Sequence, residues 1–81
     1  TQDGAECDLV LSDGIKPLYA IEIKFSSTPK KTKSFWNSIE DLGTKKNYIV
    51  IPYCDHPYSI GEKVRVSNLK YLLKNLKNEL L

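Results

Sequence analysis

The chain has 81 residues, starts at Thr1 and contains no methionine, so we expect one small domain that is part of a longer protein. Hydrophobic residues make up 41% and charged residues 27%, which is ordinary for a globular domain in water. A formal net charge of +2 is too small to identify a nucleic-acid partner by itself. No apolar run approaches the roughly 18 residues of a membrane helix, so we expect a cytoplasmic protein with no membrane partner.

Cysteine usage excludes a disulfide scaffold. Cys7 and Cys54 are too few for a disulfide framework, and their spacing fits no zinc site. We expect two reduced, partly buried thiols.

The N-terminal part of the chain predicts an antiparallel β-hairpin. Residues 7–11 are a short apolar run with one acid inside it, which is typical of a strand. Residues 12–14, Ser-Asp-Gly, are turn residues, and residues 16–17 extend the connection. Residues 18–25 form the clearest strand. Alternation in that strand places Tyr19, Ile21, Ile23 and Phe25 on one face, and Ala20, Glu22 and Lys24 on the other.

A helix and a parallel strand are predicted next. Residues 26–29, Ser-Ser-Thr-Pro, end the strand and open a helix that runs to about Leu42, with Gly43 as its C-terminal cap. Residues 47–52 have the composition of a buried strand. The order strand, helix, strand implies a right-handed crossover and parallel pairing with the strand at 18–25.

The C-terminal part predicts a loop, a short strand and a helix. Residues 53–61 are expected to be a loop, and residues 63–66 a short strand. Ser67 is a suitable N-cap for the last helix. Its apolar stripe, which we interpret as core or partner contact, consists of Leu69, Leu72, Leu73, Leu76 and Leu80.

Two acids inside apolar strands require an explanation, because burying a carboxylate costs several kcal/mol unless it is paired or binds a metal. Asp8 and Glu22 lie in the two strands of the predicted hairpin. Alternation places Glu6 on the same face as Asp8, and Lys24 on the same face as Glu22. If these faces coincide, three carboxylates and one ammonium converge.

Such a cluster has a chemical use and also a structural alternative. Asp8 and Glu22 would be metal ligands for Mg²⁺ or Mn²⁺, with water in the other positions and Glu6 as an auxiliary group. The ion would polarise a phosphodiester and lower the pKa of a bound water, while Lys24 orients that water. The alternative is a structural ion pair between Glu22 and Lys24, with Asp8 capping a turn.

The motifs that carry these residues are Gly4-Ala-Glu6-Cys-Asp8 and Ala20-Ile-Glu22-Ile-Lys24-Phe. They resemble the PD-(D/E)xK nuclease superfamily, whose metal-binding aspartate and E-x-K match Asp8, Glu22 and Lys24. More narrowly, the chain looks like the C-terminal domain of unknown function attached to prokaryotic AAA-type P-loop ATPases. No proline precedes Asp8, and the superfamily's first helix and strand would lie before Thr1.

The resemblance implies a restriction-endonuclease-like α/β (α+β) core: a mixed sheet with an antiparallel hairpin, a crossover helix, a parallel strand and a C-terminal helix. Residues 1–81 would then be a single partial domain, the C-terminal part of a nuclease-like domain. Apolar surface left by the missing elements predicts self-association.

Two functions follow as hypotheses. The first is a Mg²⁺-dependent endodeoxyribonuclease module with Asp8, Glu22 and Lys24 as catalytic residues. The second is a non-catalytic accessory domain of a P-loop ATPase, used for protein docking or DNA contact. The basic run of Lys30, Lys31 and Lys33 is a weak candidate for DNA contact, although solvated lysine faces are common.

Other candidates have a simpler interpretation. His56 in a Cys-Asp-His-Pro loop is more often solvent-exposed than a base or a ligand. Phe35 and Trp36 are expected in the core rather than stacked on nucleic-acid bases. Two further lysine runs, Lys45–Lys46 and Lys70, Lys74 and Lys77, are interpreted as solvated faces.

Overall fold

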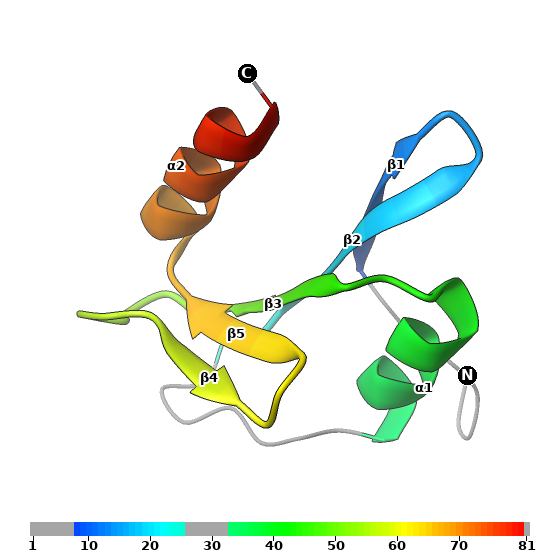
Figure 1. Cartoon of the computed structure of the whole chain (residues 1–81). Helices are drawn as coiled ribbons and strands as arrows, with labels where there is room; N and C mark the ends of the chain where they lie inside the picture. The colour runs from blue at the N-terminus through cyan, green and yellow to red at the C-terminus, as the bar shows by residue number, and fades with distance from the viewer. Residues whose placement is uncertain (1–7, 26–32, 81) are drawn as a thin grey trace.

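The computed structural model describes residues 8–25 and 33–80, which form a mixed five-stranded sheet and two helices (Figure 1). The strand order is β1-β2-β3-β5-β4. The elements are β1 (Leu9–Asp13), β2 (Lys16–Ile23), α1 (Lys33–Leu42), β3 (Lys46–Val50), β4 (Tyr58–Ile60), β5 (Val64–Ser67) and α2 (Leu69–Leu80). The expected α+β class is therefore confirmed, with a hairpin, a crossover helix, a parallel strand and a C-terminal helix.

Strands β1 and β2 form the expected antiparallel hairpin, but its turn lies later than expected. Ser12 and Asp13 belong to β1, Pro17 belongs to β2, and Gly14 takes the positive φ of 63° that the turn requires. The pairing register shifts between Leu11 and Ser12. Pro17, which pairs with Ser12, has no N–H to donate to the ladder. Strand β1 therefore continues through Ser12 and Asp13, which were expected in the turn.

Helix α1 connects β2 to the parallel strand β3 and covers one face of the sheet. Phe35 and Ile39 of α1 are buried with Ala20 of β2 and Ile49 of β3, and Trp36 and Leu42 pack against this core. The N–H of Gly43 donates to the carbonyl of Ile39 at 2.9 Å with a φ of 69°, which confirms the glycine cap. The part of the predicted helix before Lys33 lies outside the described residues.

Helix α2 packs on the opposite face. Its Leu72 is buried against Tyr19, Ile21, Tyr48 and Val50, while Leu76 is partly buried there. The two cores confirm the predicted alternation of β2, because Ala20 faces α1 whereas Tyr19 and Ile21 face α2. Only part of the leucine stripe is covered, since Leu69 and Leu73 remain more than half exposed.

Two expectations for the C-terminal part are wrong. The expected loop at 53–61 contains β4, a three-residue edge strand that pairs antiparallel with β5 and is too short to show alternation in the sequence. Ser67 is the last residue of β5 and not the N-cap of α2. The cap is Asn68, whose Oδ1 accepts a hydrogen bond from the N–H of Tyr71 at 2.8 Å.

Candidate active site

Glu22 and Lys24 lie together on the α1-facing side of β2. Glu22 is a buried carboxylate, 6% exposed, and lies beside Ile49 of β3 in the parallel register. The Nζ of Lys24 is 3.7 Å from Oε1 of Glu22, and about a third of the Lys24 side chain is exposed. The period-two alternation of β2 therefore brings a buried acid and a half-buried base to one face, as expected.

Asp8, the residue immediately before β1, reaches the same segment. Its Oδ2 accepts a hydrogen bond from the N–H of Ile23, the residue between Glu22 and Lys24, at 2.7 Å. On the other side of β2, the N–H of Lys24 donates to the carbonyl of Val50 at 2.9 Å. The E-x-K segment is thus held from both neighbouring strands, and a carboxylate replaces the backbone acceptor on the β1 side.

These contacts fit both interpretations of the sequence. The metal-site hypothesis requires Asp8 near the E-x-K, and its hydrogen bond to Ile23 places it there. The structural alternative requires an ion pair between Glu22 and Lys24 and a backbone role for Asp8, and both contacts are present. The roles of the three side chains therefore remain predictions.

Of the other predicted site residues, only Lys33 belongs to the part of the chain that the structure describes. Glu6, Lys30 and Lys31 lie outside the described residues. Lys33 is an exposed residue at the start of α1.

The weaker candidates behave as the simpler interpretation predicts. His56 is exposed, and its carbonyl accepts a hydrogen bond from the partly buried thiol of Cys54. Cys7 lies outside the described residues. Trp36 packs against the α1-side core and meets Phe35 edge to face, with ring centroids 5.9 Å apart.

The donor set suits a hard divalent cation. Among residues 8–25 and 33–80, no group of three or more His, Cys, Asp or Glu side chains comes together as a metal site. Among these described residues, Asp8 and Glu22 are the carboxylates that would hold an ion at the E-x-K, with water in the other positions. This is a ligand set that Mg²⁺ accepts, because Mg²⁺ usually keeps several waters and uses one or two carboxylates.

A second polar cluster, which the sequence did not reveal, ties the end of α2 to the sheet. The hydroxyl of Tyr19 donates to Oε2 of Glu79, and Nζ of Lys46 lies 2.7 Å from the same oxygen. The Lys46 ammonium also lies 5.7 Å from the centroid of the Tyr19 ring. The hydrogen bonds from Lys46 and Tyr19 hold the pKa of Glu79 below its usual value. Tyr19 and Glu79 are 60 positions apart, so no local pattern signals this contact.

No helix among the described residues is long and apolar enough to cross a membrane.

Comparison with known proteins places the chain in a family. No curated protein and no solved structure matches the chain. The model of one family, the domain of unknown function DUF4143, matches residues 1–72. The match does not extend to the nuclease superfamily. The chain therefore belongs to the DUF4143 family.

Proposed function

We propose that this domain is a PD-(D/E)xK-type nuclease module that hydrolyses phosphodiester bonds of DNA with Mg²⁺ or Mn²⁺ and works with an ATPase module. The observation that carries the proposal is the 2.7 Å hydrogen bond from the N–H of Ile23 to Asp8. It brings the carboxylate of the residue just before β1 to the middle of the Glu22-x-Lys24 segment. Asp8 therefore contacts the backbone of the same short stretch of β2 that carries the Glu22–Lys24 ion pair.

Each side chain has a distinct role in this proposal. Asp8 and Glu22 are the carboxylates that hold the ion. A bound divalent cation supplies electrostatic stabilisation of the phosphate and a more acidic water. Lys24, positioned by Glu22 at 3.7 Å, directs its ammonium toward the attacking water and offsets negative charge in the transition state.

Burial of Glu22 supports a functional role. The carboxylate lies among the apolar residues of the α1-facing side, where an ionised group costs several kcal/mol to desolvate. An apolar residue would fit this face of the sheet without that cost. A protein that keeps a costly charge in such a place is expected to use it.

The test is metal-dependent cleavage by matched variants. Supercoiled plasmid and a single-stranded oligonucleotide are incubated with the protein and Mg²⁺ or Mn²⁺, with EDTA as a blank. Asp8→Asn, Glu22→Gln and Lys24→Met should each lower the cleavage rate at least a hundredfold. Asp13→Asn removes an exposed acid from the far end of the same hairpin and should leave the rate unchanged. Absence of cleavage by the parent protein, or equal rates in all variants, contradicts the proposal.

Exposed apolar residues beside the E-x-K favour a second function, docking onto the ATPase module. Ile23, Phe25 and Leu69 are 50%, 91% and 57% exposed, and they line one cavity of about 190 Å³. Exposed apolar groups gathered around one cavity are typical of a contact surface. Phe25→Ser should weaken binding to the ATPase module at least tenfold in calorimetry, whereas Tyr53→Ser, at an exposed position that does not line this cavity, should not.

A further inference from the structure

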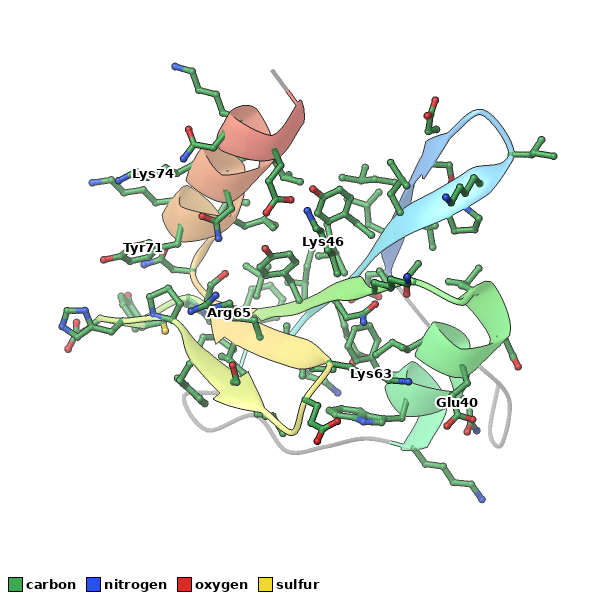
Figure 2. All side chains as sticks on the ribbon, in the orientation of Figure 1. Glu40, Lys46, Lys63, Arg65, Tyr71 and Lys74 are labelled. Carbon is green, nitrogen blue, oxygen red and sulfur yellow. The ribbon has the colours of Figure 1, made fainter. Side chains whose placement is uncertain are left out.

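A basic groove lies where β3 and β5 begin, at the opposite end of β3 from Val50, which pairs with Ile23 of the E-x-K segment. The two strands are parallel, with Asn47 opposite Val64 and Tyr48 opposite Arg65. This register brings Lys46 next to Lys63, because each lies one residue before the first pair. The labelled side chains of Lys46, Lys63 and Arg65 can be followed in Figure 2.

The groove concentrates the positive charge of the chain. It encloses about 200 Å³, and its charged lining consists of four cations and two acids: Lys45, Lys46, Lys63, Arg65, Glu62 and Glu79. The lining of the groove therefore has a formal net charge of +2. The whole chain has 12 basic and 10 acidic residues, so the remainder has eight of each and is formally neutral. Cations outnumber acids by two to one in the lining of the groove, a local excess of positive charge that attracts anions.

Most of these cations are not engaged by the protein itself. Lys46 is held by Glu79 at 2.7 Å. Lys45, Lys63 and Arg65 form no ion pair within the part of the chain that the structure describes. Like charges held on adjoining strands repel one another, and an anion between them removes that repulsion.

The groove is separate from the proposed metal site. Arg65 and Tyr48 are paired on the face that α2 covers, since Tyr48 belongs to the α2-side core. Glu22 lies on the α1-facing side and near the end of β2. A ligand of the groove would therefore not compete with an ion at Asp8 and Glu22.

We propose that this groove binds phosphate groups. Arginine presents a planar fork that matches phosphate oxygens, and lysine adds a compact positive charge. Arg65 of β5 and Lys63, the residue just before β5, supply this pair at the sheet, while Lys45, the residue just before β3, lines the groove beside them. Glu79, bound to Lys46 and Tyr19, keeps the edge formed by α2 in place. Phosphates of a nucleic-acid backbone and of a small polyphosphate share this chemistry.

The experiment measures binding of a fluorescent single-stranded oligonucleotide by anisotropy against NaCl concentration, with EDTA present so that the E-x-K site takes no part. Three unengaged cations predict a slope of log K against log salt of about −2, from about 0.7 per neutralised phosphate. Lys63→Gln combined with Arg65→Gln should reduce the slope to about −0.7 and weaken binding at least tenfold at low salt. The control is Lys70→Gln, which makes the same change of charge per residue at a position outside the groove. Circular dichroism checks that each variant is folded.

Inorganic pyrophosphate, titrated alone by calorimetry, distinguishes the two sources of phosphate. Oligonucleotide binding that depends on Lys63 and Arg65 identifies a nucleic-acid backbone as the ligand. Pyrophosphate binding with the same dependence, but no oligonucleotide binding, identifies a small polyphosphate. Binding of neither probe at low salt overturns the proposal, and so does equal binding by the double variant and the parent protein.

Discussion

Replacing Glu22 by leucine separates a functional carboxylate from a structural one. Glu22 is 6% exposed and lies on the side of the sheet that carries Ala20 and Ile49 of the α1-side core. If the carboxylate serves chemistry, its burial lowers the free energy of unfolding. An apolar side chain of similar length should then stabilise the protein. If the contact with Lys24 is structural, the same change should destabilise it.

The expected magnitude follows from burial. Burying a leucine side chain contributes about 1.5–3 kcal/mol, whereas removing one partner of a buried ion pair costs about 3–5 kcal/mol when the other partner is left buried. Lys24 remains hydrated after the change because about a third of its side chain is exposed. We therefore expect Glu22→Leu to raise the free energy of unfolding by about 1–2 kcal/mol. For a domain of this size that corresponds to a rise in Tm of at least about 4 °C.

Urea unfolding followed by circular dichroism measures this difference. Glu22→Gln is the matched control, because it removes the charge, keeps the shape and leaves a polar group to bury. The midpoint should rise for leucine and change by less for glutamine, with the same m-value in both. A loss of more than about 1 kcal/mol in Glu22→Leu would refute the reasoning and favour the structural ion pair.

Three further predictions concern the surroundings of the site. Because Lys46 and Tyr19 lower the pKa of Glu79, their contribution to stability is present above the carboxyl's ordinary pKa of 4.5 and is lost as pH falls below it. Tyr19→Phe should therefore lower the free energy of unfolding by about 1.5–3 kcal/mol at pH 7 and by less at pH 3; an equal loss at both pH values contradicts this. Asn68→Ala should cost about 1 kcal/mol in thermal unfolding, whereas Asn68→Ser should restore most of it. Phe25, 91% exposed, should promote self-association at high concentration, so light scattering should give a lower mass for Phe25→Ser.

The fold was predictable from the sequence where a hydrophobic pattern extended over a whole element, or where a cap depended on neighbouring residues. The alternation of β2, the apolar stripe of α1 and the glycine cap at Gly43 are each contained within one segment. The order of these segments then required the parallel pairing of β2 with β3. The β4 strand was missed because its three residues are defined by pairing with β5 and not by a pattern of their own.

The candidate site was predictable only in part. Two acids within apolar strands identified Asp8 and Glu22, but the sequence did not show that Asp8 bonds to the backbone of Ile23. The basic groove was not foreseen, because Lys46 and Lys63 meet only through the register of β3 and β5. Contacts made by sheet register or by packing of a distant helix, such as Glu79 on Tyr19, have no signature in a single sequence.

The most direct test of the proposed metal site is a titration of the ¹⁵N-labelled protein with Mn²⁺, followed in the amide NMR spectrum. Mn²⁺ broadens signals of nearby nuclei, so we expect the amides of Glu22, Ile23 and Lys24 to lose intensity first. The amides of β4, residues 58–60, should be unaffected at the same concentration. Asp8→Asn combined with Glu22→Gln should remove the local effect. Broadening that is uniform, centred elsewhere or unchanged in the double variant would contradict the account.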